Sequence, residues 1–451
     1  MKNNFNNFSF YHIYPLGLCG ANEKNDFITS PQKNLSKLYD WIPYIKSLGC
    51  NAIYLGPVFE SSTHGYDTTD YFYVDRRLGN NEDLKKIILY FHENGIKVIF
   101  DTVFNHVGRD FWAFKDVQEN REQSKFKDWF QNLKFEMKNQ YGEPYTYDCW
   151  EGHMSLVKLN HNNPEVRQHL LMAAKFWIKE LGADGLRIDA ADCISLNFLK
   201  EINIYCKKLK PDFWIMGEII HGDYRKWLSS GIFDSVTNYE CYKGLYSSFN
   251  DKNLFEIAYS LNRQFGKDGI YNNHVLYNFV DNHDVNRISS TLIKPDHFFP
   301  LHALLFTIPG IPSIYYGSEL GIEGKKTKES DKLLRPELNI SEILDENKNI
   351  ALVNSIKKFS KIRNESKALK YGNYIPLMTN HEQFVFARQF EDETYMVAIN
   401  ASENESIINF DFPYKGDFMI DLLNEKEVFK INGKITLNLW PNWARILKVE
   451  R

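Results

Sequence analysis

The alternation of short apolar runs with longer amphipathic stretches constrains the fold of this chain most strongly. It extends over the first three-quarters of the 451 residues. The candidate strands are Ser9–Tyr14, Ala52–Leu55, Val98–Asp101, Gly185–Asp189, Phe213–Gly217, Ser235–Asn238, Val275–Phe279 and Ser313–Tyr316. Strands that alternate with helices form a parallel sheet, and about eight such units close a barrel. We therefore predict an α/β fold, a (β/α)₈ TIM barrel.

Two helices of this pattern carry clear end signals. Glu82–Asn94 is followed by Gly95, a residue that commonly ends helices. Pro164–Leu181 has Asn163 as a suitable N-cap and a proline in its first turn. Both stretches are predicted to be barrel helices.

Two segments depart from the repeat. Residues 105–159 lack a steady period and follow the third strand, so we predict an inserted domain B on the barrel rim, which would wall the cleft. Residues 1–104 and 160–371 then form the catalytic barrel. Residues 372–451 contain four short strand patterns and are predicted to form a C-terminal β-sandwich. This sandwich is expected to be a stabilising cap rather than a starch-binding module, with Trp440 and Trp443 packed inward.

The composition excludes several classes of function. The net charge of −4 is too small to attract a polyanion, so nucleic acid is not an expected partner. We find no signal-peptide pattern and no apolar run of membrane-spanning length. The six cysteines form no CxxC pair, and without an export signal we expect reduced thiols and a cytoplasmic location. The oligomeric state is left open.

Acidic residues stand at four of the predicted strand ends, where a barrel carries its chemistry. Asp101 ends one strand and is followed by Asn105 and His106. Arg187 and Asp189 alternate along another strand, so they face the same side. An arginine beside a carboxylate keeps it ionised at neutral pH, as a nucleophile requires. A structural ion pair is the alternative.

The other two strand ends add a candidate proton donor and a polar cluster. Glu218 follows an apolar strand, and a carboxyl in a crowded site has a raised pKa and holds a proton to donate. Asp281, Asn282, His283 and Asp284 crowd the last of these ends. Acids with one arginine and two histidines, without a cysteine or histidine-rich ligand set, favour glycosyl chemistry over metal-dependent hydrolysis.

These four segments, in this order, resemble the signature regions of the α-amylase superfamily, glycoside hydrolase family 13. The resemblance covers nearly the whole chain. It includes Gly49–Pro57, the sequence His64-Gly65-Tyr66 and Gly310–Gly317. It implies a retaining α-glycoside hydrolase that works through a covalent β-glycosyl intermediate.

The resemblance also implies a role for each matching residue. Asp189 corresponds to the nucleophile, Glu218 to the general acid/base and Asp284 to the carboxylate that stabilises the transition state. The residues expected to support the nucleophile or bind the substrate are Tyr66, His106, Arg187, His283, Asp331 and Arg335.

Departures from the family pattern affect the metal and the leaving group. Two positions that usually help to bind calcium carry Lys158 and Cys193. An ammonium cannot ligate a cation, and Ca²⁺ prefers oxygen to sulfur. We therefore predict no metal at the usual family site and no cofactor. The pair Asp192-Cys193 replaces residues that normally touch the leaving group, which leaves the preferred acceptor open.

Within the superfamily, the segments Leu156–Asn160 and Gly217–His221 are similar to those of the neopullulanase and cyclomaltodextrinase group. Val157 and Ile220 replace the usual proline and tryptophan. Many members of this group carry an N-terminal domain, whereas this chain begins directly at the first strand pattern.

The expected activity is hydrolysis of α-1,4 bonds in maltooligosaccharides, cyclodextrins or related short α-glucans. A transglycosylase or an α-1,6-acting glucosidase with the same acids is the alternative. A non-catalytic sugar-binding subunit is disfavoured because all three acids are present.

Overall fold

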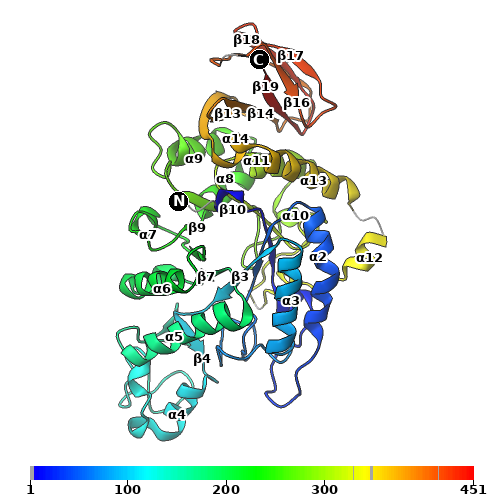
Figure 1. Cartoon of the computed structure of the whole chain (residues 1–451). Coiled ribbons are helices and arrows are strands. Elements are labelled where there is room, and N and C mark those ends of the chain that lie inside the picture. Colours follow the sequence, from blue (N-terminus) through cyan, green and yellow to red (C-terminus); the bar gives the residue numbers. More distant parts are fainter. Residues whose placement is uncertain (1–4, 329, 346–348, 415, 451) are drawn as a thin grey trace.

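The computed structural model describes residues 5–328, 330–345, 349–414 and 416–450. Eight parallel strands close the predicted barrel in the order β1-β11-β10-β9-β8-β7-β3-β2 (Figure 1). These strands are β1 (Phe10–Ile13), β2 (Ala52–Leu55), β3 (Lys97–Thr102), β7 (Gly185–Ile188), β8 (Trp214–Gly217), β9 (Ser235–Thr237), β10 (Val275–Phe279) and β11 (Ile311–Tyr315). Each of the eight predicted strands therefore exists, within one or two residues of its predicted ends.

Alternation along the strands divides the core into two layers. One set of side chains fills the barrel interior with Phe10, Tyr54, Trp214 and other large residues. The neighbouring positions along each strand join a second cluster beneath the helices. Because both faces are buried, the strands are nearly continuous apolar runs, as parallel sheets require.

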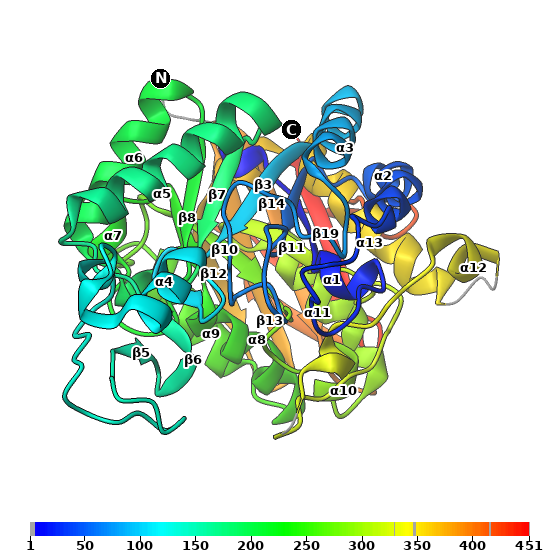
Figure 2. The same cartoon turned by 90° about the horizontal axis from the view of Figure 1, so that it is seen from below.

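Helices surround the barrel (Figure 2). They are α1 (Pro15–Leu18), α2 (Leu38–Ser47), α3 (Asn81–Glu93), α5 (Pro164–Phe176), α6 (Leu196–Leu209), α7 (Arg225–Leu228), α8 (Tyr239–Asn250), α9 (Phe255–Phe265), α10 (Ile288–Thr291), α11 (Phe298–Thr307), α12 (Ile340–Asp345), α13 (Ile350–Glu365) and α14 (Lys367–Tyr371). Helix α3 begins with a capping box between Asn80 and Asp83. The predicted helix over 164–181 begins at Pro164, but α5 ends at Phe176 and a π-helical turn, Trp177–Leu181, follows.

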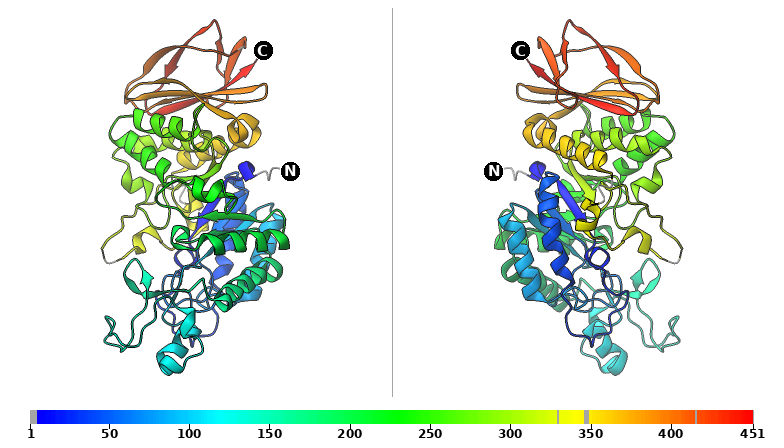
Figure 3. Two further views of the ribbon diagram at one scale, coloured as in Figure 1. Left: turned by 90° about the vertical axis from the view of Figure 1, so that its left-hand side faces the viewer. Right: turned by 90° about the vertical axis from the view of Figure 1, so that its right-hand side faces the viewer.

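The chain leaves the barrel after β3 and returns at α5. Between them lie helix α4 (Trp112–Asn120) and an antiparallel sheet in the order β4-β6-β5. Its strands are β4 (His106–Gly108), β5 (Cys149–Trp150) and β6 (His153–Lys158). This inserted sheet lies on the rim of the barrel at the end remote from the C-terminal domain (Figures 1 and 3).

The C-terminal domain contains a six-stranded sheet, β12-β13-β14-β19-β16-β17, and a two-stranded sheet, β15-β18. Their strands are β12 (Asn373–Thr379), β13 (Gln383–Phe390), β14 (Glu393–Asn400), β15 (Ser406–Asp411), β16 (Phe418–Asp421), β17 (Val428–Lys430), β18 (Lys434–Leu439) and β19 (Trp443–Glu450). Side chains from both sheets share one core, so the predicted sandwich is present.

One expectation about this domain is wrong. Trp440 does not pack inward, because 41% of it is exposed. Trp443 is half-buried, with its ring near Phe299 and its Nε1 donating to Asn424 Oδ1 over 2.7 Å. Among the described residues, no helix has the length and apolar character needed to cross a membrane.

Candidate active site

Four acidic residues meet at the carboxyl ends of the barrel strands. Asp101 lies at the end of β3, Asp189 and Glu218 directly follow β7 and β8, and Asp284 lies beyond β10. All four side chains are at least partly enclosed, and Asp101, Asp189 and Glu218 are at most 8% exposed as residues. The predicted convergence of the three candidate catalytic acids is therefore present in the fold.

Arg187 holds three of these carboxylates together. Its Nη1 donates to Asp101 Oδ1 and Asp189 Oδ1, each over 2.8 Å, and its Nη2 lies 2.6 Å from Glu218 Oε1. The guanidinium is 2% exposed. Burial alone would lower the pKa of Arg187, but the charges of the neighbouring carboxylates outweigh it and raise the pKa well above the ordinary value. Arg187 therefore stays charged and binds the two candidate catalytic residues side by side.

Glu218 has the environment of a proton donor. Burial raises its pKa, and Arg187 opposes that shift. The backbone N–H of Ala190 donates to Glu218 Oε2 over 3.1 Å, and the Tyr239 hydroxyl donates to Oε1 over 3.3 Å. Ala190 adopts a left-handed conformation with φ of 43°, which is costly for a residue with a Cβ. This conformation points its N–H at Glu218.

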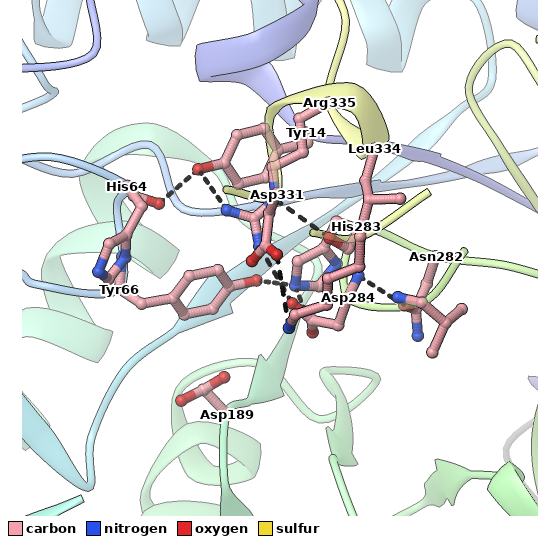
Figure 4. A network of polar contacts seen from close by, with 12 residues as sticks. Tyr14, His64, Tyr66, Asp189, Asn282, His283, Asp284, Asp331, Leu334 and Arg335 are labelled. Atoms are coloured by element: carbon pink, nitrogen blue, oxygen red, sulfur yellow. Dashed lines mark hydrogen bonds and ion pairs between the residues drawn. The ribbon is translucent and has the colours of Figure 1, made fainter. Parts of the chain in front are cut away.

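Asp189 is also buried, which raises its pKa, while Arg187 acts in the opposite direction. Asp284 differs from both. Burial disfavours its charged form, but His283 and Arg335 outweigh burial and hold its pKa well below the ordinary value. His283 Nε2 lies 2.9 Å from Asp284 Oδ2, and Arg335 Nη2 donates to Oδ1 over 3.1 Å. These two contacts, drawn in Figure 4, favour the ionised form of Asp284.

Aromatic rings surround His283. Tyr66 stacks on it with ring centroids 5.3 Å apart, and Tyr14 stacks on it at 5.9 Å. The Tyr66 hydroxyl donates to Asp101 Oδ2 over 2.7 Å and also contacts His283 Nε2. Tyr66 therefore links the carboxylates beside Arg187 to those beside Arg335.

The predicted pair Asp331 and Arg335 is also present. Arg335 Nη2 donates to Asp331 Oδ2 over 3.2 Å, and its Nε donates to the carbonyl of His283 over 3.1 Å. Its guanidinium lies 4.6 Å above the Tyr14 ring. Arg335 thus positions Asp284 directly, a contact that the sequence does not reveal.

His106 enters the site from the inserted sheet. It is 1% exposed, and burial lowers its pKa to about 3, so its ring is neutral at physiological pH. Asn105 Nδ2 lies 3.2 Å from its Nδ1, and the Trp150 ring is 5.8 Å away. Its Nε2 is buried as well, and a backbone hydrogen bond at Tyr66 acts on the pKa of the ring against the effect of burial.

Sequence reasoning missed three contributors to the site. Tyr54 donates to Asp101 Oδ2 over 2.6 Å, Tyr239 contacts Glu218, and Trp150 packs near His106. Tyr54 lies on β2, and Tyr239 comes two residues after β9, so both follow the strand-end pattern that identified the acids. Trp150 lies in the inserted domain, whose sequence has no regular hydrophobic period that would indicate the direction of this side chain.

A cavity of about 900 Å³ lies next to this cluster and is lined by Arg335, which contacts Asp284. Its walls come from the loops after β1, β2 and β11, and include Tyr14, His64, Asp331 and Arg335. In the barrel order, β1 and β8 are diametrically opposed. The cavity therefore opens on the side of the mouth away from Glu218.

A closed (β/α)₈ barrel with buried, arginine-bridged acids at its mouth has the parts that glycoside hydrolysis requires. Residues 23–349 match the model of the α-amylase catalytic domain, and residues 377–446 match that of the maltogenic amylase C-terminal domain. The chain belongs to the α-amylase family of glycoside hydrolases, glycoside hydrolase family 13.

Named relatives place the chain more narrowly. It is 36% identical over 423 residues to a cyclomaltodextrinase of Thermoanaerobacter pseudethanolicus, covering 92% of this chain and 71% of that one. A solved cyclomaltodextrinase superposes with a TM-score of 0.88 and 28% identity, over 99% of this chain and 78% of that one. An acarbose-soaked debranching enzyme of Nostoc punctiforme superposes with a TM-score of 0.80 and 27% identity, over 98% of each chain. The chain is thus related to cyclomaltodextrinases.

Proposed function

We propose that this protein hydrolyses α-1,4-glucosidic bonds in maltooligosaccharides, cyclodextrins or related short α-glucans, with retention of configuration. The observation that carries the proposal is the Arg187 bridge between Asp189 and Glu218. Retaining enzymes need two carboxyl groups about 5–5.5 Å apart, one to attack and one to protonate. Asp189 and Glu218 both contact the Arg187 guanidinium, so their carboxyl groups lie close together as this mechanism requires.

In the first step, Glu218 donates its proton to the glycosidic oxygen, and the bond from C1 to that oxygen breaks. Asp189 forms a bond to C1 and yields the β-glycosyl ester. Glu218 then removes a proton from water, which attacks C1 and releases Asp189. Asp284, held ionised by His283 and Arg335, stabilises the positive charge that develops on the sugar in both steps.

Substrate orientation follows from the same assignment. The leaving group must lie on the side of Glu218, because Glu218 protonates it. The cavity on the opposite side therefore takes the part of the chain that is transferred to Asp189. Its volume lies near the upper end of the range of about 300–1,000 Å³ for small-molecule pockets, so we expect it to hold more than one sugar.

A product profile tests the proposal. The purified protein is incubated with maltotriose, maltoheptaose, β-cyclodextrin, pullulan and panose. Release of glucose or maltose from the α-1,4 substrates supports the proposed activity. Inactivity on all five contradicts it.

A second candidate function is cleavage of α-1,6 bonds or transfer to a sugar acceptor. It is favoured by the leaving-group side, where Ile220, Asp192 and Cys193 are all exposed beside Glu218. The debranching enzyme of Nostoc punctiforme, whose fold is similar to that of this chain, also supports this candidate. Faster release of products from panose or pullulan than from maltotriose would favour this function.

We also propose that the usual family calcium position is not used. The side chains at the two positions are the ammonium of Lys158 and the thiol of Cys193. Neither group fits a hard cation that requires anionic or carbonyl oxygen. Activity and melting temperature that are unchanged by EDTA would support the proposal, whereas a loss restored by Ca²⁺ would contradict it.

Finally, we propose that the protein works in a reducing compartment, the cytoplasm. All six of its cysteines are free thiols, and four of them are buried. Thiols of this kind are typical of the cytosol. When the protein is unfolded and alkylated at the moment of extraction, mass spectrometry should find all six cysteines alkylated. Fewer alkylated cysteines would contradict the proposal.

A further inference from the structure

Arg77 is a buried arginine that lies outside the acid cluster, in the segment between β2 and α3. Its Nε donates to Asp75 Oδ1 over 2.9 Å, and its Nη2 donates to Asp75 Oδ2 over 2.7 Å. Burial opposes the charge of Arg77, but the hydrogen bonds and the charge of Asp75 outweigh burial and raise its pKa. This two-pronged ion pair fixes the plane of the guanidinium group.

The other contacts of Arg77 connect two loops. Its Nη1 donates to the backbone carbonyls of Asn22, Glu23 and Thr63 over 2.9, 3.1 and 2.7 Å. Its Nη2 also donates to Ser61 Oγ over 2.8 Å. Asn22 and Glu23 follow β1 and α1, whereas Ser61 and Thr63 follow β2. One rigid group with donors in a planar fork therefore ties the loop after β1 to the loop after β2.

The tied residues form one wall of the cavity of about 900 Å³. Asn22, Glu23 and Thr63 all line this cavity, and so does His64, the next residue along the chain. Arg77 binds the carbonyl groups of three of these four residues, so it fixes the backbone from which their side chains extend. It therefore acts on the position of this cavity wall without presenting its own side chain to a ligand.

We propose that Arg77 is a positioning residue for substrate binding, which holds the cavity wall in place for the second sugar of the transferred chain. The inference rests on the proposed function, in which this cavity takes the transferred part of the substrate. The first sugar of that part must lie against Asp189, so the wall contacts a sugar further along. A wall that is held in advance costs the substrate less ordering when it binds.

Hydrolysis of α-glucosyl fluoride and α-maltosyl fluoride tests the positioning role. Both carry fluoride on the leaving-group side, so they differ only by a second sugar on the side of the cavity. We expect Arg77→Ala to lower kcat/KM for the maltosyl compound relative to the glucosyl compound by roughly tenfold to a hundredfold, mainly through KM. Arg77→Lys keeps the charge beside Asp75 but cannot reach both loops, so it should change the ratio in the same direction.

Arg445→Ala is the matched control. Arg445 is 2% exposed and donates to Asp421 Oδ2 over 2.8 Å, but it lies on β19 of the C-terminal domain. Its loss should lower the melting temperature without changing the ratio between the two fluorides. An unchanged ratio in the folded Arg77 variants, or an equal change in Arg445→Ala, would overturn the positioning role.

Hydrogen exchange distinguishes this failure from a failure of the proposed function. The Asn25 amide donates to the Ser62 carbonyl over 2.9 Å and so reports on the contact between the two loops. In Arg77→Ala, the amides of residues 21–27 and 61–67 should exchange faster, whereas those of β7 and β8 should not. Unchanged exchange in both loops would overturn the tie. Absence of turnover of maltotriose and of both fluorides by the unchanged protein would instead overturn the proposed function.

Discussion

Replacing Arg187 with lysine tests the electrostatic design of the site. Arg187 makes charge-assisted contacts of 2.6–2.8 Å to Asp101, Asp189 and Glu218 in a buried position. A lysine carries one compact ammonium on a different stem and cannot reach three carboxylates in this geometry. We expect Arg187→Lys to retain one contact and to lose two.

The magnitude follows from those contacts. A hydrogen bond to a charged group contributes about 1.5–3 kcal/mol, so losing two costs roughly 3–6 kcal/mol. Lost from the transition state, that energy lowers kcat/KM by about two to four and a half powers of ten. The ammonium keeps the positive charge in the site, so only a carboxylate that loses its direct contact with the cation has its pKa raised.

The sign of the pH effect is definite. Arg187 lowers the pKa of Asp189 against the effect of burial, so a lysine that no longer contacts Asp189 leaves that pKa higher. The nucleophile acts only when ionised, so the acid limb of the kcat/KM profile should move to higher pH. The assay is maltotriose hydrolysis between pH 4 and 9.

Arg287→Lys is the matched control. Arg287 is equally buried, but its Nη1 donates to the Tyr316 carbonyl, and its guanidinium lies over the Tyr315 ring. This substitution should lower the melting temperature without moving the acid limb. An unshifted acid limb in Arg187→Lys, or an equal shift in both variants, would refute the reasoning.

Three further predictions concern single residues. His106→Gln should lower kcat/KM for maltotriose. Because burial holds the pKa of His106 at about 3, the acid limb of the pH profile should not move at pH values above about 4. A shifted acid limb would contradict this. Asn80→Ala removes the cap of α3 and should cost about 0.5–2 kcal/mol of unfolding free energy in urea, with unchanged turnover; an unchanged midpoint would count against the capping box. Glu319 is fully buried between the Tyr11 and Tyr44 hydroxyls, and burial raises its pKa from 4.5 to about 7. Because the folded pKa is the higher one, its contribution to stability is present below about pH 4.5 and is lost as the pH rises to about 7. Glu319→Gln should therefore gain roughly 3 kcal/mol relative to the unchanged protein between those pH values, and a pH-independent difference would exclude this.

The barrel was predictable from sequence because its strands are buried on both faces. Ala52–Leu55 is apolar throughout, and Val275–Phe279 is apolar except for Asn278; both stand between helical patterns, which leaves little ambiguity. The C-terminal strands were harder to recognise. β16 and β17 have only four and three residues, which is too short for an alternating pattern to stand out. β12 is longer but contains Pro376, which argues against a strand.

The acids were predictable for a different reason. A barrel brings the carboxyl ends of all its strands to one mouth, so Asp189 and Glu218 had to meet once the strands were recognised. The contact of Arg335 with Asp284 depends on how the loop after β11 folds back, and no local pattern encodes that path. The outward position of Trp440, where Arg445 of β19 lies over its ring, likewise has no signal in the local sequence.

Trapping the glycosyl-enzyme intermediate tests the central assignment most directly. In Glu218→Gln, α-maltosyl fluoride should still react, because fluoride leaves without protonation, whereas hydrolysis of the ester lacks its general base. The account predicts that digestion and mass spectrometry will find one maltosyl group on the peptide that contains Asp189. An adduct on another carboxylate, or turnover of the fluoride without any adduct, would contradict the assignment of Asp189 and Glu218.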